Sequence, residues 1–341
     1  LVGSEMCIRD SHYWQKDVYA SASYSFTPWR WMSLNVGYDA RHSWLEADLR
    51  NFHTVRRLDQ KAVVALQSEY RGFRLAASML YQHYRDHTRT HAGAADPLSR
   101  FTPSVTLGYS VKGFSFRAWY KKIFRAPTLN DLYYTQVGNR NLKPEYTRQF
   151  NLGAEYHYNT SRWSVSAQVD GYINSIDNRI VCLPLKGTYS WSMMNYGETY
   201  CRGLNSTVSG RFSPGDWTFS LLSSITWQRD LNRTDPTDPD TYNKPICYSP
   251  TFSCGLTGIV GWKWLTLSVS NLHVGKRMWS YADPEDVLKP YNNIDLKLTG
   301  TSRLFSASLE INDLLDEQYE HVPRYPMPGR SFTFSLSLYM K

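Results

Sequence analysis

The chain has 341 residues, of which 42% are hydrophobic and 20% charged, with a formal net charge of +8. This composition excludes long disordered segments, collagen and coiled coils, and no apolar run approaches the ~18 residues of a membrane helix. Because Lys and Arg fall singly in turns and loops, the positive charge does not indicate nucleic-acid binding. This composition does not exclude a membrane β-barrel, since only every second residue of its strands faces lipid.

The first residues differ from the rest of the chain. Residues 1–11 (LVGSEMCIRDS) show neither the later pattern nor the long apolar stretch of a signal peptide. We interpret residues 1–11 as an extension foreign to the fold and residues 12–341 as one barrel domain.

Alternation of apolar and polar residues begins at Val18 and repeats to the end of the chain. The clearest run is the last, in which Phe332, Phe334 and Leu336 alternate with Ser and Thr. Further runs begin near residues 32, 61, 73, 102, 114, 145, 163, 196, 217, 250, 264, 291 and 304. The pattern predicts an all-β, antiparallel protein of about fifteen strands without an amphipathic helix.

The connections between these strands alternate in length. Short turns are predicted at 27–28, 71–72, 112–113, 160–161, 213–215, 261–262 and 301–302. Long connections are predicted at 44–59, 86–100, 128–144, 180–195, 230–248, 278–289 and 316–330. Short turns at one end and long loops at the other are typical of an outer-membrane barrel, whose short turns and C-terminus are periplasmic.

Aromatic residues support the same interpretation. Trp29, Trp163, Trp217, Trp264 and Phe305 lie within a few residues of a short turn, as an interfacial girdle requires. The alternative is a soluble β-sandwich, which would not separate short from long connections. Unpaired backbone groups at an open sheet edge cost free energy in hydrocarbon, so a membrane-spanning sheet must close. The predicted strands are odd in number and begin on the long-loop side, so we expect further strands upstream.

Two motifs resemble a known family. The first is Phe124-Arg125-Ala126-Pro127-Thr128-Leu129-Asn130-Asp131-Leu132-Tyr133-Tyr134, followed by Gly138-Asn139-Arg140-Asn141-Leu142-Lys143-Pro144-Glu145; the second is Asn312-Asp313-Leu314-Leu315-Asp316, with Tyr319 and Pro326-Met327-Pro328-Gly329-Arg330. With the strand pattern they make residues 11–341 similar to the TonB-dependent outer-membrane receptors, nearest the cobalamin, haem and siderophore branch.

The resemblance implies a plug domain inside a barrel of about twenty-two strands. The first strand here would then be about the eighth, and the plug, the TonB box and about seven strands would lie upstream. The chain is thus expected to be the C-terminal part of an incomplete barrel. For the family motif residues Phe124, Arg125, Pro127, Asp131, Leu132, Pro144, Glu145, Gly329 and Arg330, we expect a structural or plug-facing role.

Two further groups of residues are candidates for binding. Tyr189, Trp191, Met193 and Met194 form a soft aromatic stretch suited to flat or apolar ligands, with loop packing as the alternative. His83, His87 and His91 are four residues apart but follow a strand, so we interpret them as loop histidines, with His87 or His91 the candidate for haem capture.

The cysteines are candidates for disulfides in an oxidising compartment. Cys182 with Cys201 and Cys247 with Cys254 fall at strand ends on the long-loop side. Gly329 is expected to hold a turn with positive φ. No metal site and no cofactor is expected, because the spacing of zinc ligands and the phosphate-binding glycine run are both missing.

The sequence favours a monomeric outer-membrane transporter of a Gram-negative bacterium. It would take up a scarce chelate such as an iron-siderophore, haem or cobalamin, and its partners would be the TonB energy-coupling complex and outer-membrane lipid. One alternative is a passive porin-like channel or surface-binding barrel without a plug. The third hypothesis is an outer-membrane enzyme, although no catalytic motif supports it.

Overall fold

The structure is a computed structural model that describes residues 12–50, 52–89, 93–135, 137–184 and 191–339. Within these residues no helix is both long and apolar enough to cross a membrane. The chain divides into two compact units, the first formed by residues 1–106, 120–148 and 176–197, the second by 107–119, 149–175 and 198–341.

The main sheet confirms the predicted all-β class and strand number. It contains fifteen antiparallel strands in the order β1-β2-β3-β4-β5-β6-β7-β8-β9-β10-β11-β12-β15-β16-β19. Their bounds are β1 Tyr13–Trp29, β2 Met32–Ala47, β3 Val55–Tyr70, β4 Phe73–His87, β5 Leu98–Val111, β6 Phe114–Arg125, β7 Glu145–Asn159, β8 Trp163–Pro184, β9 Trp191–Phe212, β10 Trp217–Asn232, β11 Phe252–Trp262, β12 Leu265–Val274, β15 Tyr291–Thr301, β16 Phe305–Asn312 and β19 Ser331–Leu338. The order is that of a meander, with each strand beside its predecessor in the sheet.

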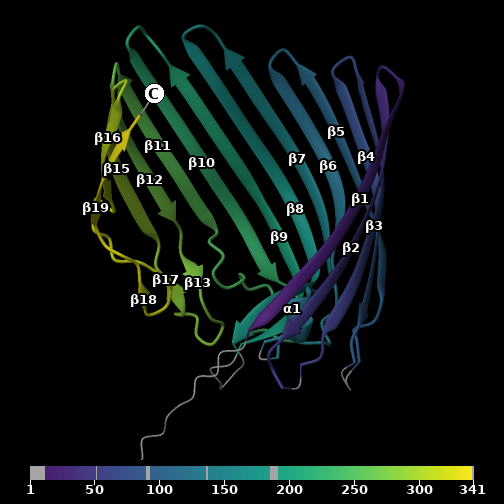
Figure 1. Ribbon diagram of the computed structural model, residues 1–341. Coiled ribbons are helices and arrows are strands. Elements are labelled where there is room, and N and C mark those ends of the chain that lie inside the picture. Colours follow the sequence, from purple (N-terminus) through teal and green to yellow (C-terminus); the bar gives the residue numbers. More distant parts are fainter. Residues whose placement is uncertain (1–11, 51, 90–92, 136, 185–190, 340–341) are drawn as a thin grey trace, which may run out of the picture. The chain divides into compact units, whose positions relative to one another are not determined.

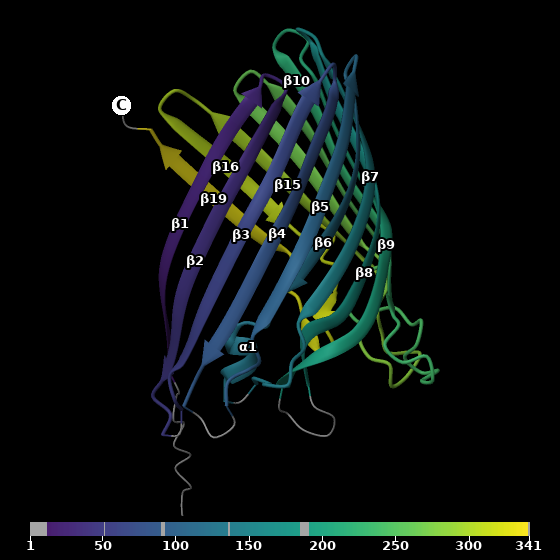
Figure 2. The same cartoon turned by 90° about the vertical axis from the view of Figure 1, so that its right-hand side faces the viewer.

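The first unit contains strands β1 to β4 entire. Figure 2 shows them side by side, with the short helix α1 (Leu129–Tyr133) near their long-loop ends. The ladders from β2 to β4 run without a register shift. Arg71 and Gly72, with φ of 48° and 84°, form the β3–β4 turn, and two successive positive φ values match the twist of paired strands.

The second unit contains β10, β11, β12, β15, β16 and β19 entire, in consecutive antiparallel pairs (Figure 1). Two small hairpins, β13 (Arg277–Met278) with β14 (Val287–Leu288) and β17 (Glu320–Val322) with β18 (Tyr325–Pro326), lie within its long connections. Strands β5 to β9 contribute residues to both units.

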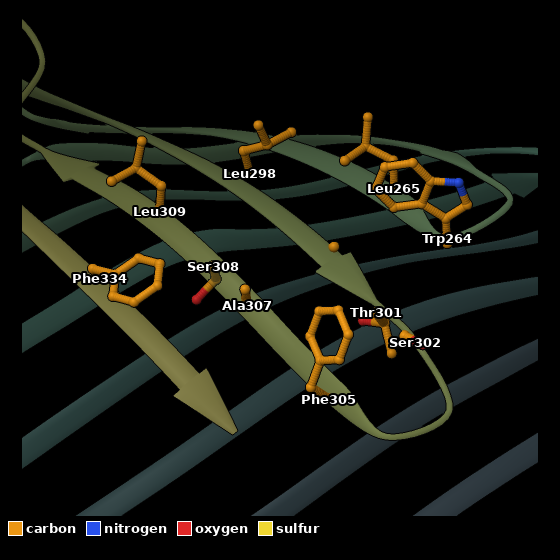
Figure 3. Close-up of a pocket in the computed structure, with 11 residues that line it drawn as sticks. Trp264, Leu265, Leu298, Thr301, Ser302, Phe305, Ala307, Ser308, Leu309 and Phe334 are labelled. Atoms are coloured by element: carbon orange, nitrogen blue, oxygen red, sulfur yellow. The ribbon is translucent and has the colours of Figure 1, made fainter. Parts of the chain in front are cut away.

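Each strand presents one apolar and one polar face. Val18, Val36, Val64 and Phe334 are exposed on apolar faces. A shallow groove of about 570 Å³ on the apolar side of β12, β15, β16 and β19 is lined by Trp264, Leu298, Phe305, Leu309 and Phe334, among others (Figure 3). An exposed apolar surface of this extent is the feature expected of a wall that faces lipid.

The polar faces differ in the length of their side chains. Across β1 and β2, Ser21 donates to Asp39 at 2.5 Å. Along β16 and β19 the opposing side chains are short, because Ser306 is paired with Ser337 and Ser308 with Ser335. The polar side of the last two strands is therefore lined largely by hydroxyl groups.

Several predicted boundaries are wrong. Strand β1 continues through the turn predicted at 27–28 and ends at Trp29. The connection predicted at 180–195 is shorter, because β8 and β9 both have 22 residues and extend into it. The sequence also missed helix α1, whose five residues are too few to display a helical period.

Candidate functional site

The first family motif ends strand β6 and begins helix α1. Phe124 and Pro127 are buried, and the proline ends the strand without a ladder donor. Thr128 caps α1: its side chain accepts from the Asp131 N–H at 3.1 Å, while the Asp131 carboxylate accepts from the Thr128 N–H at 2.9 Å. This reciprocal capping box fixes the first turn of the helix.

A buried ion pair holds α1 against the strands. Arg57 on β3 donates two hydrogen bonds to the Asp86 carboxylate on β4, at 2.6 and 2.7 Å, and a third to the Pro127 carbonyl at 2.6 Å. The Tyr133 hydroxyl donates to Asp86 at 2.8 Å and accepts from the Ala95 N–H at 3.0 Å. One arginine therefore links two strands to the entry of the helix.

The environment of Tyr133 makes its phenol harder to ionise. Burial raises the pKa of Tyr133 to about 12, and the Asp86 carboxylate adds to the increase, against the opposing effects of the Ala95 N–H and the Arg57 charge. The phenol is therefore neutral at physiological pH and remains a donor to Asp86.

A second charged group lies within the first family motif. Arg125 lies 3.6 Å from Asp131 and 3.5 Å from Glu145, measured between guanidinium nitrogen and carboxylate oxygen. The Glu145 carboxylate also accepts from the Ile180 N–H at 3.1 Å. The Arg125 side chain is half exposed, so this group is not buried. It links α1, β7 and β8 at the surface.

An apolar cluster lies beneath these polar contacts. We call it the α1 cluster; it consists of Leu45, Val55, Leu129, Leu132, Tyr133, Leu142 and Ile180. Beside it is a cavity of about 240 Å³ lined by aromatic and polar residues, including Phe52, Tyr134 and Arg140. Tyr134 stacks on Tyr13 with ring centroids 4.1 Å apart.

The segment after α1 is bonded to strand β9. The Asn139 amide donates to the Met193 carbonyl at 3.0 Å, and the Met193 N–H donates to the Val137 carbonyl at 2.8 Å. Asn195 donates to the carbonyls of Lys143 at 2.9 Å and Asn178 at 2.8 Å. Residues 137–143 are thus attached to the sheet by backbone and amide contacts.

The predicted ligand residues are only partly described. Tyr189, His91 and the Trp191 side chain lie outside the described residues. Met193, in β9, packs on the α1 cluster, and Met194 is half buried. His87 is the last residue of β4 and is exposed. Ligand binding by these residues stays a prediction.

The second family motif corrects one expectation. Gly329 does not have positive φ. Glycine is needed there because a Cβ would stand 2.6 Å from the Asp316 carboxylate, which accepts from the Arg330 N–H at 2.8 Å. A close approach, and not a left-handed backbone, explains the glycine. Of the other motif residues, Leu132 is buried and Pro144 half buried.

Neither predicted disulfide is formed in the structure. Cys182, Cys247 and Cys254 are free thiols; Cys182 is exposed, whereas Cys201 is buried. Burial raises the pKa of the Cys247 thiol. No cluster of three or more metal-ligating side chains occurs among the residues that the structure describes.

Sequence reasoning missed the residues that assemble this site. Arg57 and Asp86 come from strands outside both motifs, and Asn195 falls in a predicted loop. The one available signal was the spacing of Thr128 and Asp131, which matches a helix cap. Arg57 and Asp86 carry no comparable signal, since their pairing depends on strand register.

Comparison with known proteins finds a family match over most of the chain. Residues 7–314 match the family model described as TonB dependent receptor-like, beta-barrel. The vitamin B12 transporter BtuB of Vibrio cholerae is 25% identical over 248 residues, which cover 70% of this chain and 37% of that protein. BtuB of Photobacterium profundum is 33% identical over 88 residues, 25% of this chain and 14% of that protein.

Solved structures show the same fold. The copper transporter OprC superposes with a TM-score of 0.74 at 15% identity, covering 96% of this chain and 56% of that one. The FrpB iron transporter from Neisseria meningitidis superposes with a TM-score of 0.71 at 14% identity, covering 96% and 55%. The chain thus spans little more than a third of BtuB from Vibrio cholerae and about half of these structures.

Proposed function

Because the chain belongs to the TonB-dependent receptor family, as the match over residues 7–314 shows, we propose that it serves in the uptake of a scarce chelate across the outer membrane. The substrate class is a metal chelate or a cobalamin-like molecule, and TonB supplies the energy. The observation that carries the proposal is this match to the family's barrel. Its members are receptors and transporters, which agrees with the expectation that the chain is not an enzyme.

The proposal also concerns orientation. In this reading the long-loop ends of the strands, with α1, face outward and meet the ligand, while the short turns and the C-terminus face the periplasm. The chain contributes the later strands of a larger, monomeric barrel whose plug and TonB box belong to the rest of the protein. The strand count and the share of the relatives that the chain spans support this reading.

The names of similar proteins define the ligands to test first. One relative is a vitamin B12 transporter, and the structural neighbours include copper and iron transporters and a ferric enterobactin receptor. We therefore rank cobalamin first, since the relatives similar in sequence include BtuB, and iron chelates second.

The experiment uses a strain that lacks the gene for the full-length protein. Growth is measured with cyanocobalamin, ferric enterobactin, haem or a copper chelate as the sole source of the limiting nutrient, with and without a plasmid copy of the gene. We expect one ligand to support growth only when both the plasmid and TonB are present. Uptake that continues without TonB would overturn the proposal and identify a passive channel.

A further inference from the structure

The apolar face of strands β1 to β4 changes character at its long-loop end. The register of the three ladders places every second residue of each strand on this face. In the middle of the strands, one row across the sheet reads Tyr24, Val36, Val64, Met79. Such a row is suited to hydrocarbon.

Towards the long loops the same face becomes polar and carries the cations Lys16, Arg56 and Arg85. The row nearest the loops reads Lys16, Trp44, Arg56, His87; the next reads Val18, His42, Leu58, Arg85; and the third reads Ala20, Ala40, Gln60, His83. Arg56, Arg85 and His87 are exposed. Among the described residues of β1 to β4, the only acidic one on this face is Glu46, which pairs with Lys16 at 3.0 Å.

The two arginines are not neutralised within the described residues. Their sequence neighbours Arg57 and Asp86 bind each other on the opposite face, but Arg56 and Arg85 have no ion-pair partner in the described part of the chain. Arg56 stands opposite His87, so Arg85 is its diagonal neighbour, at about 7–8 Å between backbones. Two guanidinium groups at this spacing can donate to the oxygens of one phosphate.

A similar pattern occurs in the second unit. Arg202 on β9 stands directly opposite Arg229 on β10, and both are exposed. Next to them on the same face, towards the short turns, Leu204 stands opposite Trp227. The cationic end of an apolar face is therefore not confined to one hairpin.

We propose that the face of β1 to β4 binds a phosphate-bearing lipid of the membrane leaflet at its long-loop end, with Arg56 and Arg85 holding the phosphate. This rests on the membrane placement of the proposed function. A lipid fits better than free phosphate, because apolar rows follow beyond the row of Gln60 and His83 and provide a surface for acyl chains. Trp44 lies in the same row as Arg56 and suits the boundary between headgroup and hydrocarbon.

The experiment titrates the purified full-length protein in neutral detergent with bisphosphorylated lipid A, with lipid A stripped of its phosphates, and with inorganic phosphate. Retained lipid is counted by native mass spectrometry. We expect tight retention of the phosphorylated lipid alone. Replacement of Arg56→Gln or Arg85→Gln should weaken retention about fivefold each, the effect expected per cation near an anionic surface.

Three controls make the result specific. Arg30→Gln, in the β1–β2 turn at the other end of the strands, should leave retention unchanged. Arg56→Lys with Arg85→Lys keeps the charge and should keep most of the binding. Circular dichroism and heat-modifiable migration on gels show whether each variant is folded. Equal retention by folded wild type and the double Gln variant, or full competition by inorganic phosphate, would overturn the inference.

The outcome is separable from that of the proposed function. If the wild type imports a chelate but retains both lipids equally, only the lipid inference fails. If it imports none of the chelates but retains the phosphorylated lipid through the arginines, the inference stands and the proposed substrate class fails.

Discussion

At the scale of single residues, a few side chains decide how the long-loop end is built. Arg57 donates hydrogen bonds to the Asp86 carboxylate and to the Pro127 carbonyl. The side chains of Arg57 and Asp86 are both nearly excluded from solvent. A buried pair is costly to break from one side because the remaining charge is left without compensation. Arg74 and Glu69, at the short-turn end, form a pair that is largely exposed and serves as a matched comparison.

We predict that Arg57→Gln lowers the free energy of unfolding by about 3–5 kcal/mol, since it leaves Asp86 buried and unpaired. Arg74→Gln should cost less than about 1 kcal/mol, because water screens an exposed pair. Denaturant unfolding in detergent measures both, and hydrogen exchange of residues 128–134 locates the loss. Similar losses for the two variants would show that Arg57 does not hold α1 as described.

Gly138 is required by a close approach of the backbone. A Cβ at this position would stand 2.6 Å from the Tyr134 carbonyl oxygen and 2.7 Å from the Tyr134 nitrogen. We predict that Gly138→Ala displaces residues 134–139 and destabilises the protein by about 1–3 kcal/mol. Gly210→Ala is the control, because no atom lies within 4 Å of its added Cβ. Protease cleavage after Tyr134 should increase in the first variant alone.

At the scale of elements, helix α1 depends on its surroundings and not on its length. Five residues make too few internal hydrogen bonds for an isolated helix, so the Thr128 cap, the α1 cluster and the Tyr133 hydroxyl must hold it. The docking of α1 is therefore expected to respond to the ionisation of Tyr133.

We predict that the stability of the first unit falls between about pH 10 and pH 12. The unfolded chain ionises Tyr133 near pH 10, whereas the folded chain keeps its proton up to a pKa of about 12. The folded state therefore binds the proton more tightly and loses this advantage as the pH rises. Tyr133→Phe should flatten this part of the curve of unfolding midpoint against pH. An unchanged slope would contradict the role given to the phenol.

The elements also show what sequence alone could reach. The alternation of Phe332, Phe334 and Leu336 predicted β19 because a strand with one apolar and one polar face has a strict period of two. The first residues of β9, before Tyr196, were missed because the adjacent Met193 and Met194 follow no such period, and pairing with neighbours extends the strand. The α1 site was missed because contacts such as Arg57 with Asp86 depend on register across strands.

At the scale of the whole molecule, the division into an apolar and a polar face is the property from which the proposed membrane placement follows. In β3, Val64 lies on the apolar face, and the next residue, Ala65, faces Asn35 on the polar side. Neighbouring positions in one strand should therefore meet different solvents.

We predict opposite labelling of Val64→Cys and Ala65→Cys in the full-length protein from which its own cysteines have been removed. In proteoliposomes, a membrane-impermeant maleimide should react with the cysteine at position 65 and not with that at position 64, while in urea both should react. Because the two sites are adjacent, their depth along the strand is nearly the same. Reaction at 64 but not at 65 would reverse the assignment of faces.

The serine side chains on the polar face of β16 and β19 affect how easily another body can move along that face. Ser306, Ser308, Ser335 and Ser337 project little from the backbone and carry no charge. A body sliding past these four residues exchanges weak hydrogen bonds one at a time, and the first long charged side chain in line with them on β16 is Glu310, which pairs with Lys297 at 2.9 Å. We therefore expect these four positions to offer little resistance to a body that moves along them.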